Sequence, residues 1–510
     1  MDCLLINAAS NSVAFQKLAG KYSAIETPTW ALLLAESCRS KGYNVGILDA
    51  EAEALSDSQV KQRVLDLKPK LILFVVYGGS PNAGTTCMIG ATRTAKYLHS
   101  SQDNICFVGS HVSALPKEVL DESFIDIVFT NEGVYALHNL LKLIKDNPKN
   151  WKNKLSQVKG IGFKKDGETF LNEPEMIVPQ EKMDQDLPGY AWDLLPFKEK
   201  PLDLYRSHYW HANFDDEQRT PFAAIYTSLG CVYGCEFCMI NILNRTDMSD
   251  GVSSSNSRIM RVWSVDWVKK ELSKLAFYGV KTVKFSDELF FFDEKRYLPI
   301  LDALQKIEHD FNIWCYARVD SVRPKHLPKF KSAGINWLCL GIESGNRLIR
   351  QEVSKGSFKD VKVENIVEEI QQNGMYVLGN YIFGLPEDSI DTMNDTLKMA
   401  LEMPTEHANF YTCAALPGSP LYVESKKKYL DIPNQNEYEK FAFLSFKHIP
   451  MSTKNCTPAE VLDFRDKAWE KYFSNPIYLE FVGNRLGEVA KRNVIEMSKI
   501  KLRREILEKN

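Results

Sequence analysis

The stretch Phe222-Ala-Ala-Ile-Tyr-Thr-Ser-Leu-Gly-Cys-Val-Tyr-Gly-Cys-Glu-Phe-Cys238 decides the architecture of the chain. It begins with an apolar run, Phe222 to Tyr226, which is typical of a buried strand. It ends with Cys231, Cys235 and Cys238, spaced C-x3-C-x2-C. Because the cysteines follow a strand, we expect them on a loop at its carboxyl end, where barrel enzymes build their active sites. Three thiolates this close together in the sequence can hold one metal centre.

The three cysteines allow two kinds of metal site. A structural zinc ion would need a fourth ligand, and the upstream candidates His208 and His211 lie across a strand, where we expect them to face the wrong end of the barrel. An iron–sulfur cubane normally takes four thiolates, so three thiolates leave one iron open for another ligand. The spacing favours the iron–sulfur cluster over zinc and over chance, and does not decide between them.

A series of strand-like and helix-like segments surrounds the cysteines. Ser264 to Tyr278 is an example of the helices, with Ser264 as N-cap and Gly279 as stop. The series contains six βα units, two short of a closed eight-stranded barrel, so we expect an open, partial (β/α)6 barrel over residues 216–430. The predicted strands are Phe222 to Tyr226, Thr282 to Phe285, Ile313 to Ala317, Trp337 to Ile342, Tyr376 to Phe383 and Ala408 to Cys413.

Residues 1–145 also alternate strand-like and helix-like segments. Five strands with helices between them predict a doubly wound, Rossmann-like parallel sheet. Ligands of such sheets lie beyond the carboxyl ends of the strands, which here are Gly78-Gly-Ser-Pro-Asn82, Gly109-Ser-His111 and Asn131-Glu-Gly133. The predicted strands are Leu4 to Asn7, Asn44 to Leu48, Leu71 to Tyr77, Ile105 to Val108 and Ile125 to Phe129.

Two further regions complete the α/β chain. Residues 146–215 are rich in polar residues and turn signals such as Asp166-Gly167, so they predict a connector. Residues 431–510 predict a helical C-terminal region, with an amphipathic segment from Pro458 to Tyr472 and a basic stretch from Lys491 to Lys509. The basic stretch fits a solvated helix face or a docking surface.

Composition narrows the functional classes. The chain has 510 residues, 63 Lys and Arg against 66 Asp and Glu, and 44% hydrophobic residues, as in an ordinary folded protein. The net charge of −3 gives no bulk attraction to nucleic acid. No apolar run approaches the roughly 20 residues that span a bilayer, and we expect no secretory signal. Eleven cysteines fit reduced thiols in the cytoplasm.

With these motifs the chain resembles the radical S-adenosylmethionine (radical SAM) enzymes over residues 220–430. The C-x3-C-x2-C loop, with Phe237 before its last cysteine, is that family's signature. Strand-end motifs extend the resemblance: Phe285-Ser-Asp-Glu-Leu-Phe290, Ala317-Arg-Val-Asp320, Gly341-Ile-Glu-Ser-Gly345, Phe383-Gly-Leu-Pro-Glu387 and Leu416-Pro-Gly-Ser-Pro-Leu421. The resemblance implies a [4Fe–4S] cluster on the three cysteines. S-adenosylmethionine would chelate its open iron, and one electron would cleave it to methionine and a 5′-deoxyadenosyl radical.

The resemblance also implies the residues that hold S-adenosylmethionine. Glu343 suits a ribose or an ammonium group, and Arg318 suits the methionine carboxylate through a charge-assisted contact; both are the candidate catalytic residues. Phe237, Ser344 and Asp287 complete the predicted set. Surface ion pairing for Glu343 or Arg318, and capping or packing for Asp287, are the alternatives. A flavodoxin-like or ferredoxin-like protein is the implied electron donor.

The N-terminal region resembles one subgroup, the cobalamin-binding radical SAM enzymes. Gly109-Ser-His-Val-Ser113, Asn131-Glu-Gly-Val134 and the connector Leu187-Pro-Gly-Tyr-Ala-Trp-Asp193 carry this resemblance. It departs from the pattern at Ser110, where a glycine is usual, and at Asn131 and Val134, where an acidic residue is usual. The cobalamin-binding residues it implies are Gly78, Gly79, Ser80, Gly109, Ser110, His111, Glu132 and Gly133.

None of the nine histidines follows the D-x-H-x-x-G pattern that supplies a histidine to cobalt. We therefore expect no protein histidine below the cobalt. His111 lies near the corrin edge or is a packed polar residue, and the sequence does not decide which.

Taken together, these resemblances predict a cobalamin-dependent radical SAM methyltransferase that acts on an unactivated atom of a small-molecule or peptide substrate. A cobalamin-dependent cyclase or ring-rearranging enzyme has the same cofactors and stays open. A non-catalytic corrinoid sensor or carrier would not need the three-cysteine loop. A methylthiotransferase would need three more cysteines at N-terminal strand ends, which Cys3, Cys38 and Cys87 do not provide.

Overall fold

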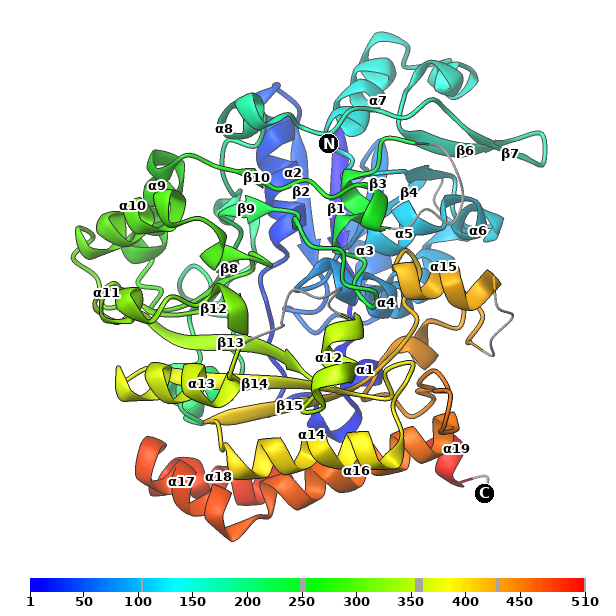
Figure 1. The fold of residues 1–510 in the computed structure, drawn as a ribbon. Coiled ribbons are helices and arrows are strands. Elements are labelled where there is room, and N and C mark those ends of the chain that lie inside the picture. The colour runs from blue at the N-terminus through cyan, green and yellow to red at the C-terminus, as the bar shows by residue number, and fades with distance from the viewer. Residues whose placement is uncertain (102–103, 248–253, 354–360, 428–431, 509–510) are drawn as a thin grey trace.

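The structure is a computed structural model, and it describes residues 1–101, 104–247, 254–353, 361–427 and 432–508. Two sheets with helices around them form its centre, and a group of C-terminal helices lies along the second sheet (Figure 1). The boundary predicted at residues 430 and 431 lies outside the described residues. Among the described residues, no helix has both the length and the hydropathy that crossing a bilayer requires.

The first sheet confirms the doubly wound prediction. Its five parallel strands run in the order β2-β1-β3-β4-β5. The strand order reverses between β1 and β3, and ligands of such sheets bind outside the carboxyl ends of the strands at this point. The strands are β1 (Cys3–Asn7), β2 (Val45–Asp49), β3 (Leu71–Val76), β4 (Ile105–Gly109) and β5 (Ile127–Phe129).

Alternating side chains bury both faces of this sheet. Leu5 and Leu73 pack in one core with helices α2 and α7, whereas Leu4 and Ile72 pack in a second core with α3 and α4. All six residues of β3 are buried, as expected for a central parallel strand. The helices are α2 (Thr29–Ser40), α3 (Asp57–Leu67), α4 (Gly84–His99), α5 (Ser110–Ala114), α6 (Pro116–Asp121) and α7 (Val134–Asp146).

The connector contributes two strands that the sequence analysis did not predict. β6 (Ile161–Lys165) pairs antiparallel with β5, and β7 (Glu168–Leu171) pairs with β6 across the Asp166-Gly167 turn. The hairpin was missed because β7 is a half-exposed edge strand whose residues are partly polar. A short helix, α8 (Met183–Asp186), follows it.

The second sheet confirms the open barrel of six parallel strands. The strands follow one another in the order β8-β11-β12-β13-β14-β15. In the sequence, β8 and β11 are separated by two short strands, β9 (Ser228–Leu229) and β10 (Arg261–Val262). These two strands form a small antiparallel sheet of their own. The barrel strands are β8 (Phe222–Ile225), β11 (Thr282–Phe285), β12 (Asn312–Arg318), β13 (Ile335–Glu343), β14 (Tyr376–Phe383) and β15 (His407–Thr412).

The barrel helices follow their sequence signals. α9 begins after Ser264, whose side chain accepts a hydrogen bond from the Trp267 N–H, and Gly279 takes a positive φ of 74° after its end. The helices are α9 (Val265–Phe277), α10 (Glu294–Gln305), α11 (Leu327–Ser332), α12 (Arg347–Val353), α13 (Val363–Gln372), α14 (Ile390–Glu402) and α15 (Pro420–Lys427).

The C-terminal region is helical, as predicted. The Thr457 side chain and Glu460 form a capping box at the start of α16. The Arg465 Nε–H of α16 donates to the carbonyl of Phe410 in β15, at 2.7 Å, which ties this region to the barrel. The helices are α16 (Pro458–Phe473), α17 (Pro476–Leu486), α18 (Glu488–Ser498) and α19 (Glu505–Glu508).

The segment after β1 connects the two sheets. It contains the short helix α1 (Asn11–Phe15), which lies close to β15 in Figure 1. Just beyond α1, the Gln16 amide donates to the carbonyl of Leu444 at 2.7 Å. Farther along, the Thr27 hydroxyl exchanges hydrogen bonds with the backbone of Ala224 in β8. The segment therefore forms a wall of the space between the two sheets.

Candidate active site

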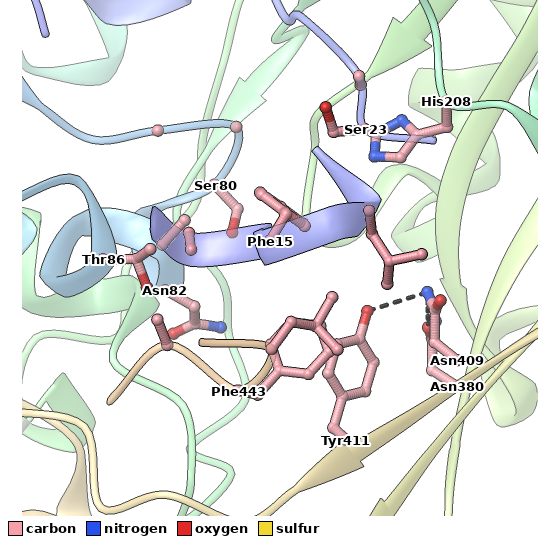
Figure 2. A pocket seen from close by; sticks show the side chains of 18 of the residues that line it. Phe15, Ser23, Ser80, Asn82, Thr86, His208, Asn380, Asn409, Tyr411 and Phe443 are labelled. Carbon is pink, nitrogen blue, oxygen red and sulfur yellow. Dashed lines mark hydrogen bonds between the residues drawn. The ribbon is translucent and has the colours of Figure 1, made fainter. Parts of the chain in front are cut away.

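One large cavity lies between the two sheets. Its volume is about 1090 Å³, above the roughly 300–1,000 Å³ that is usual for a single small-molecule site. Asn7 at the end of β1 and Gly78 beyond the end of β3 line one side, and residues along β12 to β15 line the other. The cavity thus opens at the point where the first sheet reverses its strand order. Figure 2 shows part of its lining.

The cysteine loop follows β9 beside this cavity. Polar hydrogens point at all three sulfurs: from the Tyr233 N–H to Cys231 Sγ at 3.5 Å, from Arg318 Nη1 to Cys235 Sγ at 3.7 Å, and from the Asn82 amide to Cys238 Sγ at 3.6 Å. Such donors stabilise a thiolate more than a thiol. Burial acts in the opposite direction and raises the pKa of all three thiols.

The side chains of the described residues do not converge in threes of His, Cys, Asp or Glu on a single ion. In a cubane the ligands are shared among four irons, so they need not meet at one point.

Glu343 and Arg318 lie together at this end of the barrel. Glu343 follows a register shift in β13 and takes a φ of 66°, uncommon for a residue other than glycine, and it lines the cavity. Burial raises the pKa of its carboxyl to about 7, although the positive charge of Arg318 acts in the opposite direction. Strained residues of this kind cluster at functional sites.

Arg318 is fixed more firmly than the sequence suggested. Its guanidinium makes two hydrogen bonds to Asp320, at 2.9 and 3.0 Å, and lies 3.9 Å from the centre of the Tyr233 ring. It also lines the cavity. The ion pair that was the alternative to a ligand contact is therefore present, and it orients Arg318 toward Cys235.

Four more predicted cofactor residues line the cavity: Phe237, Gly78, Gly79 and Ser80. The carbonyl of Gly79 accepts a hydrogen bond from Lys284 Nζ at 2.8 Å. A Cβ atom at Gly79 would lie 2.3 Å from a carboxylate oxygen of Glu26, so only glycine fits there without a shift.

Two predicted residues of the barrel lie outside the cavity lining. Asp287 is fully buried and accepts hydrogen bonds from the Thr227 N–H and from the hydroxyls of Thr227 and Ser228, each at 2.6 Å. Ser344 is fully buried, and its hydroxyl lies 3.2 Å from that of Thr396. Both are placed to hold loops in position, which matches the packing alternative for Asp287.

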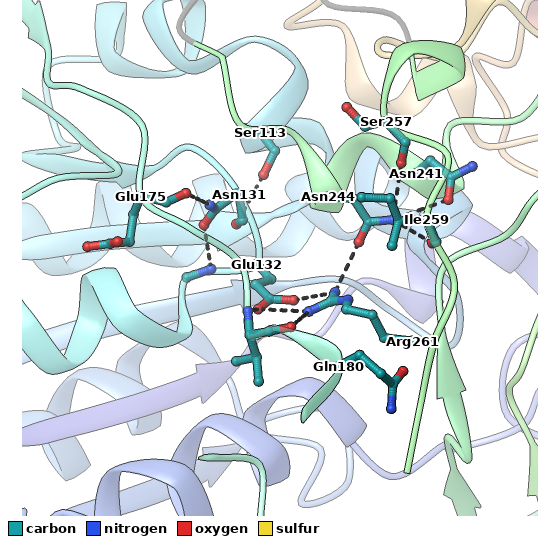
Figure 3. A network of polar contacts seen from close by, with 12 residues as sticks. Ser113, Asn131, Glu132, Glu175, Gln180, Asn241, Asn244, Ser257, Ile259 and Arg261 are labelled. Atoms are coloured by element: carbon teal, nitrogen blue, oxygen red, sulfur yellow. Dashed lines mark hydrogen bonds and ion pairs between the residues drawn. The ribbon is translucent and has the colours of Figure 1, made fainter. Parts of the chain in front are cut away.

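The remaining predicted cobalamin residues, at the ends of β4 and β5, are also absent from the cavity lining. Figure 3 shows the contacts that fill this edge. Glu132 is 1% exposed and forms an ion pair with Arg261 of β10 at 2.6 Å. The Val178 N–H donates to the same carboxylate at 2.6 Å. The neighbouring Gly133 N–H donates to the Asn131 side chain at 3.1 Å.

The loop after β4 is also packed against other described parts of the protein, which fill the space at this strand end. A Cβ atom at Gly109 would lie 2.1 Å from the Val76 carbonyl, and the Ser110 side chain is fully buried. His111 Nδ1 lies 3.0 Å from the Thr85 hydroxyl, and burial lowers the pKa of the imidazole to about 3. His111 is thus a packed polar residue.

The sequence analysis missed a buried charged group in the cavity. Lys284 of β11 has a side chain that is 2% exposed, and its Nζ lies 2.8 Å from Glu26. His208 lies 3.5 Å from the same carboxylate and lines the cavity, with its ring 5.6 Å from that of Trp314 near the amino end of β12. The signal for Lys284 was a lysine inside an otherwise apolar strand.

The cations that line the cavity are paired. Every lysine and arginine among the described residues that line it is in an ion pair with a carboxylate. The pairs are Lys284–Glu26, Arg318–Asp320, Arg465–Asp466, Arg504–Asp466, Lys467–Asp463, Lys501–Glu470 and Arg503–Glu508. Three of them belong to the basic C-terminal stretch, which is therefore largely neutralised.

Known proteins resemble both the barrel and the whole chain. Residues 225–400 match the family model of the Radical SAM superfamily. An uncharacterized methyltransferase of Pyrococcus horikoshii is 25% identical over 402 residues, which cover 78% of each chain. The anaerobic magnesium-protoporphyrin IX monomethyl ester cyclase of Rubrivivax gelatinosus is 23% identical over 467 residues, 89% of this chain and 75% of the cyclase.

Two solved structures share the overall fold. The radical S-adenosylmethionine methyltransferase TsrM of Kitasatospora setae, solved with cobalamin and a [4Fe–4S] cluster, superposes with a TM-score of 0.67 at 13% identity, over 98% of this chain and all of TsrM. The cobalamin-dependent S-adenosylmethionine radical enzyme OxsB gives a TM-score of 0.63 at 16% identity, over 97% of this chain and 72% of OxsB. Residues 225–400 therefore form a Radical SAM domain, and the whole chain has the fold that TsrM and OxsB share.

Proposed function

We propose that this radical SAM enzyme is a cobalamin-dependent methyltransferase that acts on an unactivated atom of a small-molecule or peptide substrate. The observation that carries the proposal is the large cavity between the two sheets. It is bounded by Phe237 of the cysteine loop and Glu343 on the barrel side, and by Gly78 to Ser80 at the switch point of the first sheet. Two cofactors bound at these ends would face one shared space.

The barrel side fits an iron–sulfur cluster and S-adenosylmethionine. Cys231, Cys235 and Cys238 would hold a [4Fe–4S] cluster, because each sulfur already faces a polar hydrogen. The Glu343 carboxylate has no hydrogen-bond partner among the described residues and would take the ammonium or ribose of S-adenosylmethionine. Arg318 would orient the methionine carboxylate. When bound, the cluster and S-adenosylmethionine would supply a carbon radical that removes hydrogen from the substrate. An external electron donor such as a flavodoxin or ferredoxin would reduce the cluster.

The other side of the cavity fits a corrinoid. Gly78, Gly79 and Ser80 would lie against it, and Lys284 holds their loop through the Gly79 carbonyl. Trp30 is 2% exposed and lines the cavity, yet its Nε1–H has no partner among the described residues. A buried donor of this kind calls for a polar group on a ligand. Cobalamin supplies a transferable methyl group when it is bound.

We further propose that no histidine lies below the cobalt. His111 is occupied by Thr85 and packs edge-on against Tyr438, with ring centres 5.2 Å apart. The chain's own contribution is to orient the two cofactors and to exclude water. Aromatic side chains such as Phe237 and Tyr316 line the cavity for that purpose. The cytoplasm is part of this proposal, since all eleven cysteines are free thiols.

A cyclase is the second candidate. It is favoured by the match to the magnesium-protoporphyrin cyclase, which covers more of this chain than the match to the methyltransferase. The cavity fits both reactions, because both use the same cofactors.

The product mass separates the two. Anaerobic protein with reconstituted cluster and cobalamin is mixed with reductant, trideuteromethyl S-adenosylmethionine and candidate substrates. We expect a product that retains all three deuteriums, with S-adenosylhomocysteine and 5′-deoxyadenosine in near-equal amounts. A product without the added methyl mass would replace the methyltransferase by the cyclase, and formation of neither nucleoside would end both.

A further inference from the structure

An uncharged polar surface lines the barrel side of the cavity, formed by Asn380 of β14 with Asn409 and Tyr411 of β15 (Figure 2). The Asn409 amide donates to the Tyr411 hydroxyl at 3.0 Å and to the Asn380 side-chain carbonyl at 3.1 Å. The Asn380 amide in turn donates to Cys339 Sγ at 2.9 Å. These bonds hold the three side chains in one arrangement. We call them the amide–tyrosine face.

The face keeps hydrogen-bonding capacity for a ligand. With both Asn409 amide hydrogens used, its carbonyl oxygen remains an acceptor, and it has no partner among the described residues. The Tyr411 hydroxyl accepts from Asn409, so its own hydrogen remains a donor. Burial raises the pKa of Tyr411 far above its usual value and that of Cys339 to about 12, so the face carries no charge at neutral pH.

Aromatic rings flank this face. The Phe443 ring lies 4.9 Å from the ring of Tyr411, and Phe15 of α1 projects into the same part of the cavity (Figure 2). Ring faces and edges of this kind bind the ring of a ligand favourably.

Arg318 is assigned above to the methionine carboxylate, and the other described cations that line the cavity are paired with carboxylates of the protein. The most deeply buried ammonium of the cavity, Lys284, is used by Glu26 and by the Gly79 carbonyl. Glu288 and Glu343 line the cavity outside any of those ion pairs. A buried anion without a cation is strongly disfavoured.

We propose that the substrate of the function proposed above is an uncharged aromatic or heteroaromatic molecule. Its ring lies against Tyr411 and Phe443, and its polar edge bonds to Asn409 and Asn380. Anionic substrates are rejected because Lys284 is neutralised by Glu26.

Two probes of similar shape test the role of charge. Indole-3-acetamide is neutral, and indole-3-acetate has nearly the same shape but carries a carboxylate in place of the amide, so it also lacks the two amide N–H donors. Equilibrium dialysis of each against the anaerobic full-length protein at physiological salt is expected to show at least about tenfold tighter binding of the amide. Equal binding, tighter binding of the acetate, or no binding of either probe at millimolar concentration would overturn the proposal.

Variants locate the binding. Asn409→Leu and Tyr411→Phe are expected to weaken the amide probe by about tenfold and threefold. Asn394→Leu, at an exposed position of α14, should leave the affinity unchanged. If Asn409→Leu binds like the natural chain, the probe lies elsewhere and the proposal is wrong.

A gain of function gives the sharpest test. Glu26→Gln keeps the shape of the side chain and releases the Lys284 ammonium, so the acetate probe should bind at least about tenfold tighter than to the natural chain. A melting temperature of Glu26→Gln within a few degrees of that of the natural chain confirms that the variant folds. If Glu26→Gln unfolds, the binding of the amide probe by Asn409→Leu still tests the proposal. Cleavage of S-adenosylmethionine is measured separately. The charge preference with no cleavage would contradict the proposed function alone, whereas cleavage without the preference would contradict only the substrate class.

Discussion

The first sheet has two pairs of strand ends that look alike in sequence and differ in structure. Beyond β1 and β3 the chain leaves a cavity, lined by Gly78, Gly79 and Ser80. Beyond β4 and β5 the corresponding loops are filled, because Glu132 pairs with Arg261 and His111 bonds to Thr85. Both edges carry glycine and polar residues. The comparison teaches that a polar strand end becomes a ligand site only where no other part of the chain occupies it.

The largest effect is expected on the cavity side. Replacing Cys231, Cys235 and Cys238 together by alanine should remove all bound iron and all cleavage of S-adenosylmethionine, because no cluster remains to reduce it. Iron and acid-labile sulfide analysis of anaerobically purified protein measures the bound cluster. Release of 5′-deoxyadenosine measures the cleavage of S-adenosylmethionine. Bound zinc without sulfide in the natural chain would contradict the cluster, and Cys106→Ala, a buried thiol in β4, is the control.

The filled edge should respond in stability and not in ligand binding. Glu132→Ala leaves the buried Arg261 guanidinium without its carboxylate, which costs about 3–5 kcal/mol. Urea unfolding measures the loss, with the exposed Glu199→Ala as control. If folded Glu132→Ala protein also loses most of its affinity for hydroxocobalamin, the corrinoid lies at the filled edge and the comparison fails.

The open edge should respond in the opposite way. Gly79→Ala places a Cβ atom 2.3 Å from the Glu26 carboxylate, so either this carboxylate or the loop must shift. We expect hydroxocobalamin to bind about tenfold more weakly, which corresponds to about 1.4 kcal/mol. The absorbance spectrum of hydroxocobalamin measures this binding. Gly483→Ala, in α17 outside the cavity lining and without a positive φ, is the control for an added methyl group. Unchanged affinity in Gly79→Ala would show that the loop does not contact the corrinoid.

The smallest effect is a pH dependence. The pKa of Glu343 is about 7 because the carboxyl is buried, and we expect only the ionised form to bind the ammonium of S-adenosylmethionine. Affinity should therefore be highest above pH 7 and fall as the pH is lowered through 7, by at most about tenfold per unit. Equilibrium dialysis from pH 6 to 8 measures it. Glu343→Gln should bind weakly with no such slope, and an equal slope in this variant would assign the titration to another group.

Much of the fold could be predicted because periodic patterns and caps act locally. The six barrel strands, the five strands of the first sheet and the start of α9 at Ser264 all follow from apolar runs and capping residues. The edge hairpin β6–β7 could not, since a strand exposed on one face has no long apolar run. Its pairing with β5 depends on a neighbour that is distant in the sequence.

The sequence by itself determined which groups meet at the barrel end: Cys231, Cys235 and Cys238 on one loop, with Arg318 and Glu343 at the ends of strands that share an edge. Short spacing and parallel strands are enough to bring these groups together. Only the tertiary structure decided where the ligand space lies. The edge beyond β5 is closed by the ion pair of Glu132 with Arg261, which lies 129 positions away in the sequence. Lys284 in the cavity pairs with Glu26, which lies 258 positions away. No local pattern records such contacts, because burial and charge pairing depend on which distant segments the fold packs together.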